Sequence, residues 1–387
     1  MTAAPNVAEA VETVASNLHP VPSFDLADHP VPGGREEVWR FTPLLRLRGL
    51  LEGKPSDDRL TFRADLPEGV TTTRLSPVEV ALLGVPAPVD RPSALAVANS
   101  GGAVLIDIPA DLELSEPFVI DLTGVGGLVY GNLVLRVGTH ASATVVLRHT
   151  GSAKYASSVS VLVGEGARLT FVNLQDWAED AVHAGHVGLR VGRDAQVRTV
   201  TASLGGDLVR LVETAEYAGP GGQLEQFGVY FVNAGQHIEH RMFVDHNAPN
   251  TASHVDYRGA LQGEGAHSVW VGDVLIRKVA EGITTYETNK NLVLTEGCRA
   301  DSVPNLEIET GEIQGAGHSS TTGRFDDEQL FYLRSRGIPE DEARRLVVQG
   351  FFAEIIRRIG VPEVETRLLA VVEKELQVIV GIPEGSK

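Results

Sequence analysis

The chain has 387 residues, of which 43% are hydrophobic, enough to bury a large core in two or three domains or in one extended solenoid. Its 51 acidic and 33 basic side chains give a formal net charge of -18, which disfavours binding to nucleic acid or to anionic lipid. The single cysteine, Cys298, rules out an intramolecular disulfide and the secreted disulfide scaffolds. The N-terminus lacks the order of a signal peptide, and no run of about 18 apolar residues occurs. We therefore expect a soluble, cytoplasmic protein.

Residues 1–94 are predicted to form an N-terminal region of helical and irregular structure. Apolar residues recur at helical spacing from Val7 to Leu18 and stop before Pro20, which favours a short amphipathic helix. A proline-rich connector follows. The segment around Trp39 is expected to lie on the surface, pinned by its aromatic side chains.

Residues 95–323 are predicted to form a β-helix, a solenoid of strands that alternate apolar and polar residues. A Val-Gly-x-x-Ala phrase occurs at 137–141, 163–167 and 191–195, with its glycines 26 and 28 residues apart. A glycine-centred turn at this interval suits a solenoid, because each coil buries one face against the next. The alternative, a β-sandwich of hairpins, would place its turns about 8–12 residues apart.

Helical spacing returns in residues 324–387, which are predicted to form a C-terminal helical subdomain with three helices. A capping-box pattern at Asp326 begins the first helix, and Gly337 stands where that helix would end. Pro339 begins the second helix and Pro362 the third. The apolar stripe of the second helix is expected at Ala343, Val347, Phe351, Ile355 and Ile359. The predicted fold class is thus mainly β, a β-helix core with helical segments at both ends.

Several short phrases resemble the SufB/SufD family in their order and spacing. They are Tyr-Arg-Gly at 257–259, Val-Gly at 271–272, Thr-Asn-Lys-Asn-Leu at 288–292, Pro-Asn-Leu-Glu-Ile at 304–308, and the block at 316–338 that contains His318. This family comprises the paired scaffold proteins of the SUF machinery, which assembles iron-sulfur clusters. The chain is more similar to the SufD-type than to the SufB-type members, and the family's β-helix fold agrees with the strand pattern.

The resemblance implies a non-catalytic scaffold subunit of a SufBCD complex, with no stably bound cofactor. In the family, two scaffold β-helices join edge to edge, and helical C-terminal regions bind the SufC ABC-type ATPase. The implied partners are therefore a SufB-like scaffold and a SufC-like ATPase, and a homodimer without SufB is left open. An iron-sulfur cluster usually takes about four protein ligands, mostly thiolates, and this chain has one thiol. A nascent cluster would therefore be shared transiently with SufB.

His318 is the first candidate site residue. In SufD-type proteins, a histidine at this place is implicated in building the nascent cluster at the interface with SufB, and a neutral imidazole is a suitable ligand for iron. The alternative is a histidine that only forms hydrogen bonds within a turn. Family members often carry a cysteine just before this block, where the chain has Ala316 and Gly317. That difference weakens any expectation that this subunit alone holds iron.

Cys298 is the second candidate. It lies six residues before Pro304, a spacing similar to that of the essential cysteine in SufB-type proteins. Iron requires the thiolate, which Arg299 would favour and the acidic residues Glu296 and Asp301 would oppose. A buried structural thiol is the alternative. If Cys298 instead holds the cluster directly, the chain is a SufB-like subunit.

Three histidines, His237, His240 and His246, form a further candidate metal site. In an extended strand, His237 and His240 point to opposite faces, which makes a closed metal site awkward. The alternative, which we favour, is that the histidines are polar residues on outward faces of adjacent coils. No phosphate-binding loop, nucleophile elbow or placed nucleophile-base pair is present. A β-helical enzyme acting on carbohydrate or acyl groups remains an alternative function, supported by analogy of fold alone.

Overall fold

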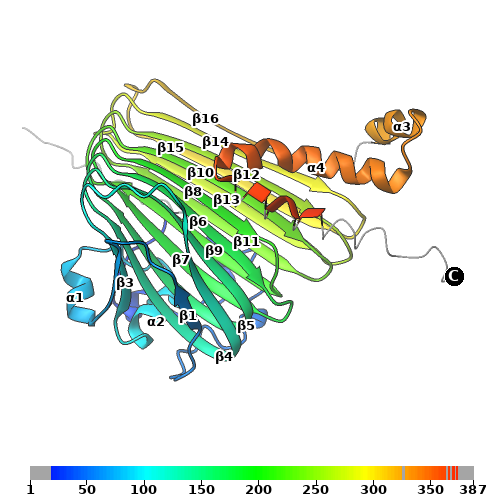
Figure 1. The fold of residues 1–387 in the computed structure, drawn as a ribbon. Helices are drawn as coiled ribbons and strands as arrows, with labels where there is room; N and C mark the ends of the chain where they lie inside the picture. Colours follow the sequence, from blue (N-terminus) through cyan, green and yellow to red (C-terminus); the bar gives the residue numbers. More distant parts are fainter. Residues whose placement is uncertain (1–18, 325–326, 363–364, 367, 371, 374–387) are drawn as a thin grey trace, which may run out of the picture.

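The computed structural model describes residues 19–324, 327–362, 365–366, 368–370 and 372–373. Within these residues the protein is mainly β, and its core is a parallel β-solenoid of about eight turns (Figure 1). The predicted fold class is confirmed. The predicted N-terminal helix at residues 7–18 lies outside the described residues, as does most of the helix expected after Pro362.

Each turn of the solenoid contributes one strand to each of two stacked faces. The odd face contains β7 (Val182–Val191), β9 (Leu208–Tyr217), β11 (His237–His246), β13 (His267–Ile276) and β15 (Arg299–Ile308). The even face contains β6 (Arg168–Trp177), β8 (Gln196–Ser203), β10 (Gln223–Val232), β12 (Ala252–Leu261), β14 (Thr284–Val293) and β16 (Gly315–Arg324). The longer β4 (Phe118–Val137) and β5 (Ser142–Val163) run through both faces.

Strands stacked within one face are parallel, and residues in register on successive coils are 26 to 32 positions apart in the sequence. This long interval excludes the β-sandwich. The repeated Val-Gly-x-x-Ala phrase forms corners between strands, and its fourth residue has a positive φ each time: 57° at His140, 63° at Gly166 and 53° at Asp194. A β-carbon on Gly138, the phrase's first glycine, would come within 2.4 Å of the Ala110 backbone nitrogen. The sequence repeat therefore marks tight corners in which one residue adopts the left-handed backbone conformation.

Large aromatic rings fill the interior where glycine stands in the neighbouring coil. Tyr230 lies against Gly259, and Tyr257 lies against Gly228. A β-carbon on Gly259 would approach Cε2 of Tyr230 to 1.8 Å, and one on Gly228 would approach Cδ1 of Tyr257 to 2.0 Å. These glycines are thus required by packing within a strand.

Gly259→Ala is expected to lower the free energy of unfolding by about 1–3 kcal/mol, because the added methyl group must displace the buried Tyr230 ring. Gly311→Ala is the control, since no atom lies within 4 Å of its added β-carbon. Chemical denaturation of both variants measures the difference. Equal unfolding midpoints for the two variants would contradict the proposed packing.

The N-terminal end of the solenoid is closed by short strands. β3 (Ala103–Ile108) extends the odd face, whereas β2 (Thr71–Leu75) pairs antiparallel with β3, and β1 (Thr61–Ala64) pairs antiparallel with β4. Two helices, α1 (Pro77–Leu82) and α2 (Arg91–Asn99), begin at capping boxes and lie at the same end (Figure 1). The predicted boundary between residues 94 and 95 thus falls inside α2.

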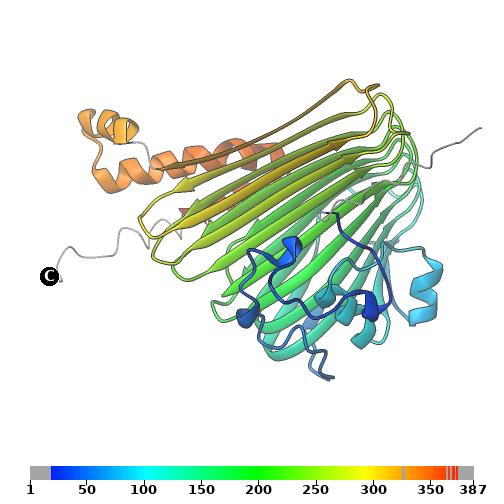
Figure 2. The ribbon, with the colours of Figure 1, turned by 180° about the vertical axis from the view of Figure 1, so that it is seen from behind.

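Ahead of β1, the chain crosses the outer side of the odd face (Figure 2). This N-terminal segment, residues 19–50, contains three short 3₁₀ helices: η1 (Leu26–Asp28), η2 (Glu37–Trp39) and η3 (Leu44–Leu47). Trp39 and Leu47 are buried. The segment around Trp39 is therefore pinned to the solenoid, as expected.

At the other end, α4 (Glu340–Ile359) packs on the outer side of the even face, and α3 (Asp327–Ser335) packs against α4 and projects beyond the solenoid (Figure 1). Described buried residues of α4 are Ala343, Val348, Phe352, Ile355 and Ile356. The predicted stripe was therefore one position early at Val347 and Phe351, which are only half-buried. Among the described residues, no helix combines the length and apolar character needed to cross a bilayer.

Candidate functional site

The solenoid is open at its C-terminal end. β15 terminates the odd face and β16 terminates the even face, and no described strand pairs with the outer edge of either one. Both strands are 10 residues long, whereas β1 and β2 at the closed end have 4 and 5 residues. Long edge strands present unpaired backbone groups to other chains. The open end is therefore the natural candidate surface for association.

His318 lies in β16, in register with Glu287 of β14. Ala316 packs on the interior core, and Thr322 accepts a hydrogen bond from the buried Asn291 side chain. Because side chains alternate along a strand, His318 faces the same interior side as Ala316 and Thr322. No described coil covers it, so the imidazole is exposed. His318 thus stands at the mouth of the solenoid interior.

Cys298 lies in the corner between β14 and β15 and is half-buried. Its Sγ is 3.4 Å from the Gly263 carbonyl oxygen and 3.5 Å from Thr295 Oγ1. Arg299, which was expected to favour the thiolate, instead forms an ion pair with Asp301, with Nε 2.7 Å from Oδ2. The surroundings of Cys298 in this chain are those of a packed corner residue.

The structure does not bring the two candidate residues together. Ser302 of β15 donates a 2.6 Å hydrogen bond to Asn289 across the interior. His318 is in register with Glu287, two residues before Asn289, whereas Cys298 precedes Ser302 by four residues. At about 3.3 Å per residue, roughly 20 Å separates the imidazole from the thiol along the strand direction. A single iron ion on this chain could not contact both side chains.

Polar side chains line the interior over most of its length. Near β5 to β7, one hydrogen-bonded group contains His149, Ser157, Asn173, Gln175, Trp177 and His183. Nearer the open end, a second group contains Thr201, Glu213, Gln226, Tyr230, Tyr257, Asn289, Asn291 and Ser302. Buried polar groups are stable when they are hydrogen-bonded to one another, as these are. These side chains therefore form a polar column within the otherwise apolar interior, and the column ends beside His318.

Close to the open end, several buried polar atoms have no hydrogen-bond partner among the described residues. Among them are both carboxylate oxygens of Glu287, both ring nitrogens of His240 and the indole nitrogen of Trp270. Burial, reinforced by the negative charge of Asp273, raises the pKa of Glu287 well above its usual range. Glu287 was not singled out in the sequence.

The expected outward placement is wrong for two of the three histidines of β11. His240 lies in the interior, between the rings of Tyr230 and Tyr257, and His246 stacks on Tyr217. His237 does face outward, as strand alternation predicts, but it is buried beneath the N-terminal segment. No set of three metal-ligating groups occurs among the described residues.

His246 supports a prediction about pH. Burial lowers its pKa to about 4, and its ring nitrogens bond to Thr251 at 2.7 Å and Ser253 at 2.9 Å. The ordinary value is about 6.5, so as pH falls from 6.5 toward 4 the unfolded chain takes up the proton first, and up to about 3 kcal/mol of stability is lost. Urea unfolding between pH 7 and 5 should therefore show a shallower pH dependence for His246→Gln than for the parent protein. Parallel slopes would show that folding does not lower the pKa of His246.

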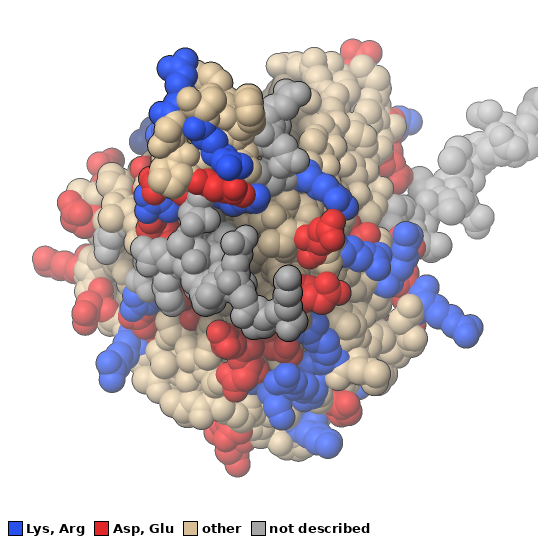
Figure 3. All heavy atoms as spheres, turned by 90° about the vertical axis from the view of Figure 1, so that its right-hand side faces the viewer, with Lys and Arg blue, Asp and Glu red and all other residues tan. Residues whose placement is uncertain are grey.

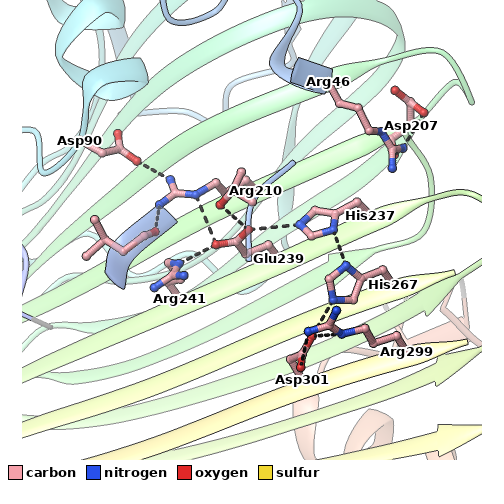
Figure 4. Close-up of polar contacts among 12 residues, drawn as sticks. Arg46, Asp90, Asp207, Arg210, His237, Glu239, Arg241, His267, Arg299 and Asp301 are labelled. Carbon is pink, nitrogen blue, oxygen red and sulfur yellow. Dashed lines mark hydrogen bonds and ion pairs between the residues drawn. The ribbon is translucent and has the colours of Figure 1, made fainter. Parts of the chain in front are cut away.

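A buried charge cluster lies between the outer side of the odd face and the N-terminal segment (Figure 4). The fully buried carboxylate of Glu239 accepts hydrogen bonds from Arg241 Nε at 2.5 Å, Thr42 Oγ1 at 2.8 Å and His237 Nε2 at 3.1 Å. It also forms an ion pair with Arg210, whose Nε lies 3.4 Å away. Burial opposes ionisation of Glu239, yet Arg241, His237 and Arg210 hold its pKa well below the usual range. Glu239 is thus a buried anion stabilised by its neighbours.

Arg210 joins this cluster to the N-terminal region. It donates to Asp90 at 2.5 Å, and its guanidinium lies 4.0 Å from the centre of the Trp39 ring. Nearer the surface, Arg46 donates to Asp207 at 2.7 Å (Figure 4). On the other side, His237 contacts His267 at 3.1 Å. The cluster ties β9, β11 and β13 to residues 38–90.

The face from which the C-terminal helices project carries acidic and basic side chains interspersed with one another (Figure 3). Ion pairs account for several of them, including Arg345 with Glu342 and Glu373. Such mixed charge does not form the single-signed basic surface that binds nucleic acid.

Comparison with known proteins gives a consistent result. The family profile described as "SUF system FeS cluster assembly, SufBD core domain" matches residues 119–351. An iron-sulfur cluster assembly SufBD family protein of Mycobacterium bovis is 50% identical over 385 residues, covering 97% of each chain. One from Mycobacterium leprae is 49% identical over 365 residues, covering 92% of this chain and 93% of its own.

Mycobacterium leprae also has a second, more distant relative of the same description. It is 26% identical over 277 residues, which cover 71% of this chain but 32% of that relative. One organism thus contains two different proteins of this description.

Proposed function

Since this chain belongs to the SufBD family of iron-sulfur cluster assembly proteins, we propose that it is a SufD-like scaffold subunit without catalytic activity of its own. In this proposal it pairs with a SufB-like chain through β15 and β16, and a SufC-like ATPase binds its C-terminal helices. The nascent cluster forms at the paired edge, where His318 contributes an imidazole. The observation that carries the proposal is the open pair of long edge strands with His318 beside them.

The geometry of the two ends supports pairing through one particular surface. An unpaired strand edge binds another strand through backbone hydrogen bonds. A second solenoid with the same spacing between strands offers edges that match both β15 and β16. The two SufBD relatives of Mycobacterium leprae suggest that the partner is a different member of the same family.

The C-terminal helices support a second contact. Phe331 is 74% exposed and the neighbouring Tyr332 is also exposed, both on α3, which packs against α4. Large exposed aromatic residues are characteristic of protein interfaces. We therefore place the ATPase on α3.

Co-expression with the host's SufB-like and SufC-like proteins, followed by affinity purification and mass measurement, tests the assembly. Recovery of one complex containing all three chains is the expected result. If this chain purifies alone while both partners fold, the family relationship reflects ancestry only, and a β-helical enzyme becomes the function to test.

A pair of proline substitutions tests the surface. Ser320→Pro removes a backbone N–H that points away from β14 at the free edge of β16, since Gly315 and every second residue after it point their N–H groups toward β14. Thr72→Pro removes one from β2 at the closed end; both substituted residues are exposed. Ser320→Pro is expected to lower recovery of the SufB-like partner at least tenfold, whereas Thr72→Pro leaves it unchanged. Thermal unfolding of each variant alone separates lost pairing from lost folding. Normal recovery with a folded Ser320→Pro variant argues against pairing through β16.

Cys298 separates this proposal from the SufB-like alternative. We expect Cys298→Ser to retain cluster assembly, because the thiol packs in a corner roughly 20 Å along the strands from His318. His318→Ala should abolish assembly while the chain remains folded. If Cys298→Ser is as defective as His318→Ala, the thiol holds the cluster directly.

A further inference from the structure

Glu287 is the buried residue that the fold explains least well. It is 1% exposed, and neither carboxylate oxygen has a hydrogen-bond partner among the described residues. No ion pair of Glu287 with a lysine or arginine is formed in this part of the chain. An isolated buried carboxylate costs several kcal/mol unless it is neutralised or bound to a cation.

Glu287 lies beside His318 at the open end of the solenoid. Glu287 is in register with His318 on the neighbouring strand, so their α-carbons are about 4.8 Å apart and both side chains face the interior. β16 is the last described strand of the even face, so the space above this pair opens outward. An exposed imidazole and a buried carboxylate thus stand side by side at the mouth of the polar column.

No hydrogen bond fixes the orientation of this carboxylate. Oε1 of Glu287 lies where a β-carbon on Gly272 would come within 2.9 Å of it, so the glycine provides the room that the side chain occupies. Because neither oxygen has a hydrogen-bond partner, rotation toward His318 breaks no hydrogen bond within the described residues. Apolar ring carbons of Trp270 lie close to the same point, and Asp273 is near enough for its negative charge to act on Glu287.

We propose that Glu287 and His318 together form a half-site for ferrous iron, with Glu287 as the carboxylate ligand and the partner chain supplying the remaining ligands. Imidazole and carboxylate are both suitable ligands for Fe²⁺. Placing the cation beside Glu287 would also supply the counter-charge that this buried group lacks. The inference deepens the proposed function and rests on it, because the partner completes the site.

Metal titration of the anaerobically purified complex tests the half-site. Co²⁺ serves as the probe, since its visible absorption reports ligation, and Fe²⁺ is then measured by competition. Glu287→Gln should weaken binding of both ions about tenfold or more, as should His318→Ala. Glu281→Gln is the control, because this exposed carboxylate lies in the preceding corner. Glu287→Gln conserves shape and replaces a buried group that has no hydrogen-bond partner among the described residues, so its melting temperature should be unchanged or higher.

The outcomes distinguish this inference from the proposed function. If the complex forms and Glu287→Gln binds Co²⁺ like the parent protein, Glu287 is not a ligand, although the scaffold role stands. If His318→Ala also leaves binding unchanged, the half-site is wrong in both ligands. If no complex forms, the same Co²⁺ titration is carried out on the chain alone. A tenfold difference in affinity between the parent protein and Glu287→Gln supports the half-site, and equal affinities overturn it.

Discussion

Replacing Arg210 with alanine is expected to lower the free energy of unfolding by about 3–5 kcal/mol, because it leaves buried Asp90 without its counter-charge and removes one of the two arginines beside Glu239. Arg210 is 1% exposed and lies between Asp90 and Glu239. The substitution also removes the guanidinium from the face of Trp39. The N-terminal segment should therefore loosen from the odd face before the solenoid itself unfolds.

Denaturant unfolding and limited proteolysis measure the two parts of this prediction. Arg277→Ala is the matched control: its guanidinium also binds a carboxylate, Asp245 at 2.7 Å, but its side chain is 47% exposed. That pair should contribute less than about 1 kcal/mol. The prediction fails if Arg210→Ala and Arg277→Ala have the same stability, or if cleavage in residues 19–50 is not faster in Arg210→Ala.

Phe352→Ala is expected to lower stability, whereas Phe331→Ala is expected to lower affinity for the ATPase. Phe352 is fully buried between α4 and the even face, so its loss should lower the free energy of unfolding by about 3–5 kcal/mol through lost burial and a new cavity. Phe331 projects from α3 into solvent, so its loss should leave stability unchanged and lower affinity for the SufC-like ATPase at least tenfold.

Thermal unfolding and a binding titration with the purified ATPase check both variants. Phe331→Ala that binds the ATPase normally would remove α3 from the proposed interface. A Phe352→Ala protein with unchanged melting temperature would show that α4 contributes little to the fold. The two residues lie in one short helical region, so each serves as the control for the other.

The solenoid could be predicted because its signal is local and repeated. The corners at His140, Gly166 and Asp194 all require a left-handed residue, and the same five-residue phrase encodes each of them. The prediction for α4 gave Val347 and Phe351 where Val348 and Phe352 are buried, because helical spacing alone does not define which of two neighbouring residues faces the sheet.

The closed N-terminal end was described only as helical and irregular, although the sequence contains its helix starts. Ser76 with Glu79, and Asp90 with Ser93, form the capping boxes of α1 and α2. Strands β1 and β2 are too short to show a clear alternation. Their pairing depends on β3 and β4, which follow them in the chain.

The charge cluster could not be predicted from spacing. Asp90 meets Arg210 across 120 positions, and Thr42 meets Glu239 across 197. Glu287 could have been recognised, because it shares alternation parity with Asn289, Asn291 and the buried Thr285. A charged residue at an inward position of a strand signals either a paired charge or a ligand.

The unlike ends of the solenoid limit the size of any assembly it builds. A stack that could add strands at both ends would propagate as a filament, since each added copy would present a new edge. Here one end is closed by β1 and β2, so two solenoids can meet only through their open ends, face to face. Such a pair would leave a third copy only the short outer edges of β1 and β2. Under the proposed pairing, closure at one end thus disfavours growth beyond two solenoids.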